Sequence, residues 1–295
     1  MYLDAPMHDD SMERYARHLI LPEFLHGGQD RLRAGSVLVI GAGGLGSPAA
    51  LYLAAAGVGT IGLCDFDEVE VSNLQRQVLH ATPDIGRPKV ESARDHLAAL
   101  NPGVRFVLHP HRADAFNLRE MVRGYDFVLD CADGFPIKFL INDACVLENK
   151  PFCHAGVLRW EGQILTCLPW RSASYRCVFS EPPPPEAVPS CSQAGVFGPL
   201  VGVLGTLQAS EAIKYLIGVG QEVDKGTAAR RVCGREIGAG DPGELLENRL
   251  WVMDLLHLRT RIVKVARRGD WPAGAAHPTI TTLVEAPSGA ACPRP

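Results

Sequence analysis

Apolar runs punctuated by glycines dominate the first part of the chain. Ser36–Ile40 and Thr60–Cys64 are almost entirely apolar, as expected of strands that are covered on both faces of a sheet. Between them, Leu45–Ala56 is rich in alanine and leucine and predicts a helix. A strand, a glycine turn, a helix and a second strand explain the uncharged stretch 37–64 better than a membrane span does.

The same alternation continues along the chain. Further strands are predicted at Val104–Leu108 and Tyr125–Asp130, and further helices at Ser11–Ile20, Lys89–Leu100 and Ile137–Glu148. Strands that alternate with helices favour an α/β fold of the Rossmann type. We therefore expect a mostly parallel sheet with helices on both faces.

In the second part of the chain, the predicted strands follow one another instead of alternating with helices. Successive strands are predicted at Phe152–Val157, Gln163–Leu168, Leu250–Met253 and Arg261–Val265, and a long apolar helix at Phe197–Ile217. We expect these strands to extend the sheet in antiparallel fashion and the helix to pack in a core or a dimer interface rather than in a membrane. The proline run 181–185 predicts a stiff loop.

One domain is predicted over residues 1–265. Within it, residues 220–243 are polar and glycine-rich and predict a mobile insertion. Residues 266–295 are rich in proline, glycine and alanine and predict a disordered tail.

Composition narrows the class of protein. The chain has 46% hydrophobic and 21% charged residues and a formal net charge of -4, which argues against binding to a nucleic-acid backbone. The N-terminus does not resemble a signal peptide, and we expect a cytoplasmic protein without a membrane span. The nine cysteines include no C-x-x-C pair, so most of them are interpreted as core residues rather than as a disulfide framework.

The clearest chemical signal is the loop Gly41-Ala42-Gly43-Gly44-Leu45-Gly46. It follows a predicted strand and opens a predicted helix, where glycines permit close backbone approach and the helix N-terminus attracts phosphate. Asp65 ends the next strand, where an acid can bind ribose hydroxyls. The loop therefore predicts a nucleotide-binding site.

Polar residues after Asp65 indicate which nucleotide binds. Asn73, Gln75, Arg76 and Lys89 supply more positive charge and amide groups than a pyrophosphate needs, and they suit a triphosphate. Asp133, after the strand that ends at Asp130, is a candidate Mg²⁺ ligand. The alternative for Asp133 is an N-cap of the following helix.

Several motifs in combination resemble the ThiF/MoeB/HesA family of ubiquitin-activating-enzyme-like adenylyltransferases. The resemblance extends from about Arg14 to Val265 and is closest to the molybdopterin-synthase and thiamine sulfur-carrier adenylyltransferases. It rests on the motifs Arg14-Tyr15-Ala16-Arg17-His18, the glycine loop, Asp65-Phe66-Asp67, Ser72-Asn73-Leu74-Gln75-Arg76-Gln77, Gly86-Arg87-Pro88-Lys89, Glu161-Gly162-Gln163 and Ala194-Gly195-Val196.

The resemblance implies a reaction and a set of partners. The C-terminal glycine of a small ubiquitin-like sulfur carrier ending in Gly-Gly would attack the α-phosphate of ATP and release pyrophosphate. A separate sulfur donor, such as a rhodanese or a cysteine desulfurase, would then load the carrier. The active form would be a homodimer in which Arg17 reaches the ATP of the partner.

The resemblance also assigns roles to residues. Arg17, Arg76, Lys89, Asp133 and Cys191 would serve catalysis, with Mg²⁺ on Asp133 and ribose on Asp65. The expected nucleotide-binding residues are Gly41, Gly43, Gly44, Gly46, Asp65, Asp67, Ser72, Asn73, Gln75, Arg76, Lys89, Asp133 and Gly134.

The chain departs from the family pattern at several positions. Where the family carries two zinc-binding C-x-x-C pairs, this chain has Ser174-Tyr175-Arg176-Cys177 and Trp271-Pro272-Ala273-Gly274. Since structural zinc needs four ligands, no zinc site is expected. Gly134 replaces the family's asparagine, and Lys138 stands where the family carries an arginine near the nucleotide.

Some alternatives remain open at this point. Cys191 is either a reactive thiol that links to the carrier or handles sulfur, or an ordinary loop cysteine. An NAD(P)-dependent oxidoreductase could use the same glycine loop, but it leaves Arg76, Lys89 and Asp133 without a role. A non-catalytic nucleotide-binding member of the family is a third reading. The sequence does not distinguish molybdopterin, thiamine, cysteine, thiolated tRNA or another sulfur-containing product.

Overall fold

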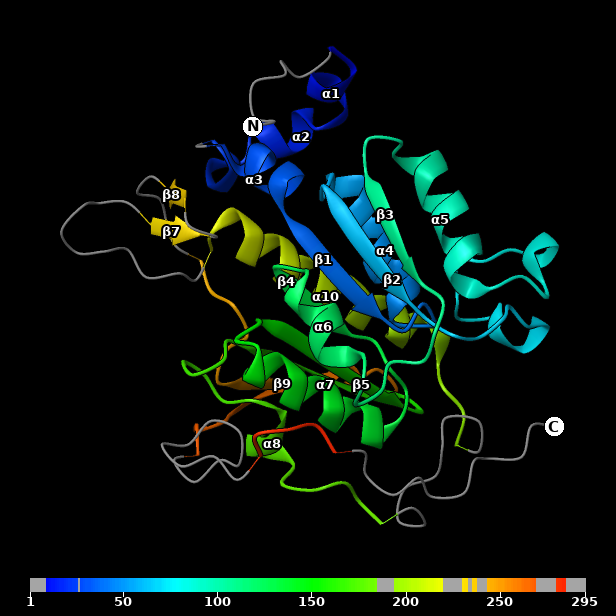
Figure 1. The fold of residues 1–295 in the computed structure, drawn as a ribbon, viewed down its shortest axis with the longest axis vertical. Coiled ribbons are helices and arrows are strands. Elements are labelled where there is room, and N and C mark those ends of the chain that lie inside the picture. The colour runs from blue at the N-terminus through cyan, green and yellow to red at the C-terminus, as the bar shows by residue number, and fades with distance from the viewer. Residues whose placement is uncertain are drawn as a thin grey trace.

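The computed structural model describes residues 9–25, 27–184, 194–219, 230–232, 235–237, 243–268 and 280–284. Their centre is an eight-stranded sheet with the order β10-β9-β6-β5-β4-β1-β2-β3 (Figure 1). The predicted Rossmann-like α/β architecture is confirmed, and the order of the strands explains where the site lies.

The parallel half of the sheet is formed by the strands that precede residue 160. They are β1 (Ser36–Ile40), β2 (Thr60–Cys64), β3 (Arg105–His109), β4 (Phe127–Asp130) and β5 (Phe152–Leu158). β1 lies in the middle and pairs in parallel with β2 and β4. The chain reverses its direction of winding at β1, and ligands bind at such a position in open α/β sheets.

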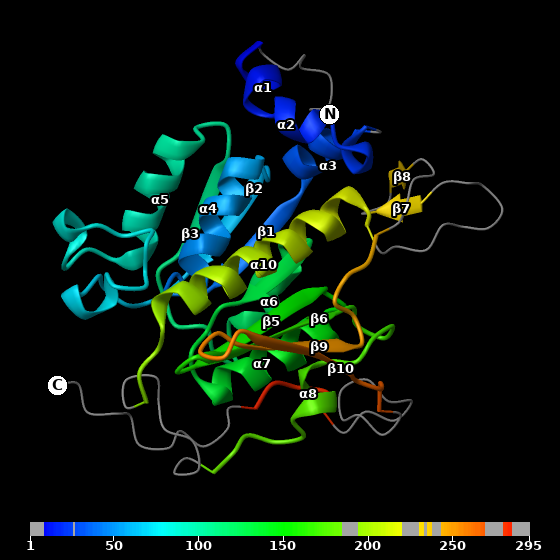
Figure 2. The ribbon, with the colours of Figure 1, turned by 180° about the vertical axis from the view of Figure 1, so that it is seen from behind.

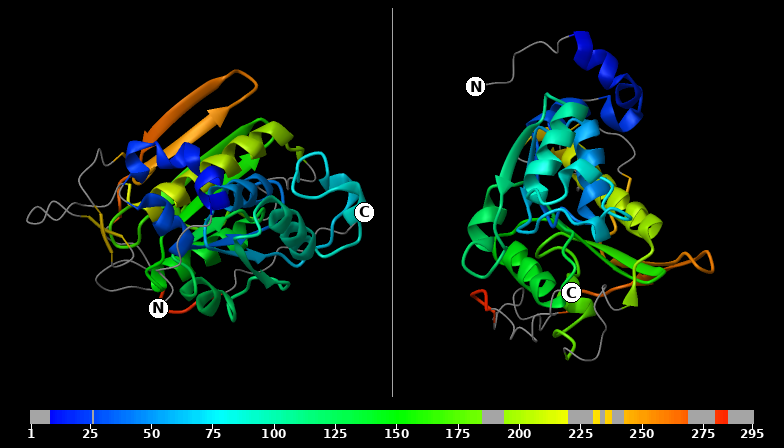
Figure 3. Two further views of the ribbon diagram at one scale, coloured as in Figure 1. Left: turned by 90° about the horizontal axis from the view of Figure 1, so that it is seen from above. Right: turned by 90° about the vertical axis from the view of Figure 1, so that its right-hand side faces the viewer.

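The other half of the sheet is antiparallel, as predicted. It consists of β6 (Glu161–Cys167), β9 (Arg249–Asp254) and β10 (Arg259–Lys264). Figure 3 shows the β9–β10 hairpin extending from the body of the molecule. All residues of β10 are exposed.

Helices cover both faces of the sheet. The face seen in Figure 2 carries α3 (Gly28–Ala34), α4 (Gly46–Ala56), α5 (Lys89–Leu100) and α10 (Gly198–Ile217), and the opposite face carries α6 (Leu118–Arg123), α7 (Phe135–Leu147) and α8 (Tyr175–Val178). Alternate residues of β1 enter the two cores: Val37 and Val39 one cluster, Leu38 and Ile40 the other. This period of two explains why the strand is apolar throughout.

Helix α10 is long and apolar enough to cross a membrane by length and composition alone. It packs against α4 and against β4, β5 and β6 (Figure 2), so the structure supports the prediction of a core helix. Gly205 permits this packing, because a Cβ there would lie 2.2 Å from the Leu45 carbonyl oxygen.

The N-terminal helix differs from the prediction. The expected single helix Ser11–Ile20 is divided into α1 (Asp9–Arg14) and α2 (Ala16–Leu19). Tyr15 lies at the break, and its hydroxyl accepts a 2.8 Å hydrogen bond from Asn101. This tertiary contact holds the chain at the point where it turns.

Short elements complete the fold. The 3₁₀ helices are η1 (Pro22–Phe24), η2 (Val71–Asn73) and η3 (Thr82–Asp84), and the stretch predicted as an insertion carries a hairpin of β7 (Arg230–Val232) and β8 (Arg235–Ile237). Within the predicted tail, Ile280 and Leu283 pack against the core on the α7 face.

The cysteines of the described residues are free thiols, and most belong to the core as predicted. Cys64, Cys131, Cys145, Cys153 and Cys167 are buried. Burial and the nearby Asp65 raise the pKa of the Cys64 thiol to about 12, so this thiol is unreactive at neutral pH.

Candidate active site

Strand register brings three loops together at the carboxyl edge of the parallel strands. Ile40, the last residue of β1, lies opposite Cys64 on β2 and Asp130 on β4. The loops that begin at Gly41, Asp65 and Cys131 therefore start side by side. A Cβ at Gly41 would lie only 2.6 Å from the Cys131 carbonyl oxygen, which shows how closely the glycine loop approaches the loop of Asp133.

The glycine loop forms an anion-binding cradle. Gly41 adopts a φ of 99°, and a Cβ at Gly46 would lie 1.9 Å from the Gly41 carbonyl oxygen, so both positions require glycine. In the part of the chain that the structure describes, the backbone N–H groups of Gly43, Gly44 and Leu45 donate to no protein acceptor. Free N–H groups before the 11-residue helix α4 suit a phosphate.

Asp65 is bound to the glycine loop through its backbone. Its carboxylate accepts hydrogen bonds from the Ala42 N–H at 2.8 Å and from the Asp67 N–H at 2.9 Å. Burial raises the pKa of Asp65, while Lys89 and these hydrogen bonds oppose the rise. A carboxylate oxygen can accept more than one hydrogen bond, so Asp65 can orient the loop and still accept from a ribose hydroxyl.

The segment after η2 contacts the glycine loop from the side. A Cβ at Gly44 would lie 3.6 Å from Arg76 Cγ, and one at Gly43 would lie 3.4 Å from Gln77 Nε2. Arg76 Nη1 donates to the Ser72 carbonyl oxygen at 3.0 Å, so its guanidinium is partly pre-organised. The predicted proximity of Arg76 to the phosphate cradle is present in the structure.

The amides of this segment differ in exposure. Asn73 is buried and donates to Ser72 Oγ at 3.1 Å. Gln75 is exposed, and its carbonyl oxygen would lie 2.8 Å from a Cβ at Gly198, the first residue of α10. Close packing of this turn against α10 fixes the position of the neighbouring Arg76.

Lys89 is connected to the site by an ion pair with Asp67. It is the first residue of α5, its side chain is 6% exposed, and its Nζ lies 3.0 Å from Asp67 Oδ2. The Lys89 N–H also donates to the Asp67 carbonyl oxygen. Lys89 therefore forms an ion pair in the structure and adds positive charge next to Asp65.

Asp133 is exposed and directly precedes α7. The N-cap of α7 is Gly134, and no side chain of the described residues caps this helix, so the alternative reading of Asp133 as an N-cap is wrong. Its carboxylate is available at the edge where the glycine loop lies. Among the described residues, no group of three or more His, Cys, Asp or Glu side chains could hold a metal ion. A Mg²⁺ ion on Asp133 would therefore need phosphate oxygens and water as its other ligands.

Lys138, which stands where the family carries an arginine, forms an ion pair with Asp130 in the structure. It is buried and donates to both oxygens of Asp130, at 3.1 and 3.2 Å, and to the Ala155 carbonyl oxygen at 2.8 Å. His154 Nδ1 also donates to Asp130, at 2.7 Å. Burial alone would raise the pKa of Asp130, but Lys138 and His154 lower it. These contacts join α7, β4 and β5 next to the loop that carries Asp133.

Arg17 does not approach the glycine loop of its own chain. It is exposed on α2, and its neighbour Tyr15 lies against Gly57 and Asn101. These residues precede β2 and β3, so α2 lies at the amino edge of the parallel strands (Figure 1). The glycine loop lies at the opposite, carboxyl edge.

Other predicted positions fall outside the described residues. These are Cys191 and the stretch Trp271-Pro272-Ala273-Gly274. Ser174 and Cys177 stand where the family carries its first zinc-binding cysteine pair. Ser174 is buried, and Cys177, in α8, is partly buried. The expectation of no zinc stays a prediction.

Sequence reasoning missed Gln77 and His80 as site residues. Gln77 is buried beside Gly43, and its Oε1 has no hydrogen-bond partner among the residues that the structure describes. His80 Nε2 lies 3.0 Å from the Ala42 carbonyl oxygen. Both residues closely follow Arg76 in the sequence, and this closeness to a predicted site residue could have indicated that they lie near the site.

The fold and this cradle define a nucleotide-binding α/β protein. Residues 15–271 match the model of the ThiF family, and the chain belongs to that family. This confirms the resemblance noted in the sequence.

Curated relatives are similar over most of the chain. It is 48% identical over 217 residues to the sulfur carrier protein adenylyltransferase of Thermus thermophilus, covering 72% of this chain and 80% of that protein. It is 41% identical over 282 residues to the probable adenylyltransferase/sulfurtransferase MoeZ of Mycobacterium tuberculosis, covering 94% of this chain but only 64% of that protein. The chain is thus shorter than some of the relatives that it matches.

Solved structures support the fold. MccB of E. coli superposes with a TM-score of 0.73 at 21% identity, covering 92% of this chain and 74% of MccB. At this identity, the similarity is evidence for the fold alone.

Proposed function

We propose that this protein uses ATP to adenylylate the C-terminal glycine of a small ubiquitin-like sulfur carrier and releases pyrophosphate. The observation that carries the proposal is the convergence of the free N–H groups after Ala42, the Asp65 carboxylate, Arg76 and Asp133 at one edge of the sheet. The names of the relatives, sulfur carrier protein adenylyltransferase and adenylyltransferase/sulfurtransferase, support the same reaction.

Each group has a physical role in this reaction. The loop N–H groups and the N-terminus of α4 bind phosphate oxygens, and Asp65 accepts from the ribose. Arg76 and Lys89 stabilise the negative charge that builds up when the carrier's carboxylate attacks the α-phosphate. Mg²⁺ held by Asp133 would supply further positive charge to the phosphates.

The dimer is part of this proposal. Arg17 is exposed at the amino edge of the strands, where it is free to enter a site on another chain. In a symmetric dimer, each chain can then complete the site of its partner. Sulfur loading from a separate donor, such as a rhodanese or a cysteine desulfurase, would follow adenylylation.

Exchange between ATP and labelled pyrophosphate tests the reaction. We expect exchange in the presence of a carrier that ends in Gly-Gly and its loss with the same carrier lacking the terminal glycine. Absence of exchange with every Gly-Gly carrier, despite ATP binding, would favour a non-catalytic nucleotide-binding protein. Binding of NAD without binding of ATP would favour the oxidoreductase.

A further inference from the structure

Arg17 belongs to a helix that cannot hold its position by itself. Helix α2 has four residues and none of them is buried, and so short a helix is not stable in isolation. Arg17 is exposed and makes no hydrogen bond or ion pair with the residues that the structure describes. Its place therefore depends on what holds its neighbours Tyr15 and His18.

A buried amide holds Tyr15. Asn101 follows α5 and is 2% exposed. Its Nδ2 donates to the Tyr15 hydroxyl at 2.8 Å and to the Ala54 carbonyl oxygen at 2.7 Å, and its Oδ1 accepts from the Gly103 N–H at 3.2 Å. Because a carbonyl only accepts and an N–H only donates, the amide has one possible orientation. Gly57 leaves room for the Tyr15 hydroxyl, since a Cβ there would lie 2.4 Å from it.

A second buried amide holds His18. Gln29 in α3 is 4% exposed, and its Nε2 donates to the Ala56 carbonyl oxygen at 2.8 Å. Its Oε1 lies 3.2 Å from His18 Nδ1, and since an amide oxygen only accepts, His18 donates this hydrogen bond. We call the contacts Asn101–Tyr15 and Gln29–His18 the two tethers of α2.

The tethers attach α2 to helices that begin at the nucleotide site. Ala54 and Ala56 belong to the last turn of α4, where backbone carbonyls lack partners within the helix, and α4 starts at the glycine loop. Asn101 follows α5, whose first residue is Lys89. Arg17 is thus held at the far ends of two helices whose N-termini meet the nucleotide.

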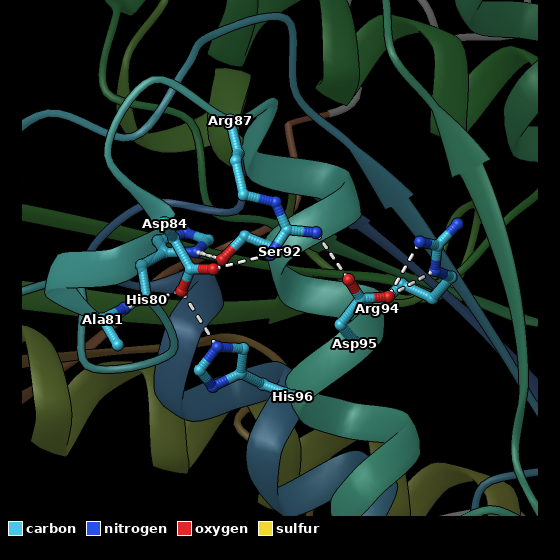
Figure 4. A network of polar contacts seen from close by, with 8 residues as sticks. All are labelled: His80, Ala81, Asp84, Arg87, Ser92, Arg94, Asp95 and His96. Carbon is cyan, nitrogen blue, oxygen red and sulfur yellow. Dashed lines mark hydrogen bonds and ion pairs between the residues drawn. The ribbon is translucent and has the colours of Figure 1, made fainter.

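A network around Asp84 fixes α5 in turn (Figure 4). Asp84 in η3 is buried and accepts from the Ala81 N–H at 2.9 Å and from Arg87 at 2.7 Å. His96 Nε2 lies 2.9 Å from the same carboxylate, and Arg87 also donates to Asp95 at 2.5 Å. Since Asp95 and His96 lie on α5, the network joins this helix to the loop that precedes it. The Asn101 tether therefore has a fixed base.

We propose that the two tethers are positioning contacts that hold Arg17 for the site of a partner chain. They fix the backbone on both sides of a side chain that has no attachment of its own. Misplacing a catalytic group by about 1 Å can cost up to about 100-fold in rate. Asn101 and Gln29 lie with α2 at the amino edge of the strands, so they act through Arg17. This inference rests on the proposed function, in which Arg17 completes the site of the partner.

Mixed dimers of differently tagged chains test the tethers. Arg76→Ala silences the site of one chain, so the remaining pyrophosphate exchange comes from the site of the other, active chain. Tyr15→Phe removes the accepting hydroxyl and His18→Leu removes the donating N–H, and both leave the amides bonded to α4. On the silenced chain, which supplies Arg17 to the active site, the two changes together should reduce exchange by about tenfold. On the active chain they should leave exchange unchanged.

Two controls separate positioning from an effect on folding. In chains that carry Arg17→Ala, adding Tyr15→Phe and His18→Leu should cause no further loss, because no guanidinium is left to position. Tyr125→Phe removes another hydroxyl, which lies 2.8 Å from His109 Nε2, and its two placements should give equal exchange.

The outcomes distinguish this inference from the proposed dimer. Equal exchange from the two placements of the α2 changes, or a further loss in the Arg17→Ala background, would overturn the role of the tethers. The dimer would still stand if Arg17→Ala on the silenced chain abolishes exchange. Exchange that survives Arg17→Ala on the silenced chain would overturn both.

Discussion

Lys138 and Asp130 form a buried ion pair at the base of the site. Their contact distances of 3.1 and 3.2 Å place the ammonium between both carboxylate oxygens, and both side chains are less than a tenth exposed. The pair links the start of α7 to the end of β4, so it supports the loop of Asp133 from below.

We expect Lys138→Met to destabilise the protein by about 3 kcal/mol, because it leaves the buried Asp130 carboxylate without its ammonium partner and with only the hydrogen bonds from His154 and Ala132. Urea unfolding measures this change. The double variant with Asp130→Asn should lose much less than the sum of the two single losses, since it leaves no unpaired charge. A Lys138→Met protein of normal stability but weakened ATP affinity would instead place the ammonium at the nucleotide.

Helix α10 offers a matched pair of glycines. A Cβ at Gly205 would lie 2.2 Å from the Leu45 carbonyl oxygen, whereas one at Gly202 would meet no atom of the described residues within 4 Å. We expect Gly205→Ala to destabilise the protein by about 1–3 kcal/mol and to weaken ATP binding by displacing the glycine loop. Gly202→Ala should stabilise the helix by up to about 1 kcal/mol. Equal melting temperatures for the two variants would contradict this account of the packing.

The sequence was most informative where structure is local. The bounds of β1, β2 and α5 agree with their prediction, because uncharged runs and glycine or proline signals delimit them. Helix α3 was missed because its buried residues include the polar Gln29 and Arg31. Arg31 donates to the Ile217 carbonyl oxygen at the end of α10, a partner that no local pattern reveals.

The same distinction applies to the site. Asp65 and Arg76 lie beside the glycine loop, where their predicted roles require them, because they follow the next strand in a compact segment. The environment of Lys138 could not be predicted, because its partners Asp130 and Ala155 belong to two different strands. His80 was missed because its partner Ala42 lies 38 residues earlier.

The network around Asp84 predicts a dependence of stability on pH. The pKa of Asp84 is lowered to about 2 in the folded protein, below the value of about 3.9 for an unfolded chain. Its contribution to stability is therefore fully present above about pH 4 and is lost as the pH falls toward 2. We expect Asp84→Asn to cost about 1–3 kcal/mol at pH 7, with a difference from the wild type that narrows below pH 4.

Urea unfolding at several pH values checks this prediction. Asp95→Asn is the control, since Asp95 also pairs with Arg87 but its side chain is 43% exposed. An exposed ion pair of this kind contributes less than about 1 kcal/mol. A constant difference between Asp84→Asn and the wild type from pH 7 to pH 2 would be incompatible with the assigned pKa.

The position of Arg17 predicts complementation between chains. The β1 strand alone spans about 16 Å from the amino edge to the carboxyl edge, so Arg17 cannot reach the glycine loop of its own chain. We expect Arg17→Ala and Arg76→Ala to lose pyrophosphate exchange when each is tested alone, by about 100-fold. A mixed dimer of the two contains one intact site, formed by Arg76 of one chain and Arg17 of the other. Random pairing makes about half of the dimers mixed, so a coexpressed equal mixture should recover about a quarter of the wild-type activity.

A second mixture provides the control for this experiment. Arg76→Ala and Lys89→Ala both remove groups from the site of their own chain, so their mixed dimers contain no intact site and should recover nothing. Differently tagged chains, purified in two steps, isolate the mixed dimers in both cases. If the dimers of Arg17→Ala with Arg76→Ala are as inactive as those of the control, Arg17 does not complete the partner's site. Recovery confined to the first mixture can arise only if Arg17 acts on the ATP bound by the other chain.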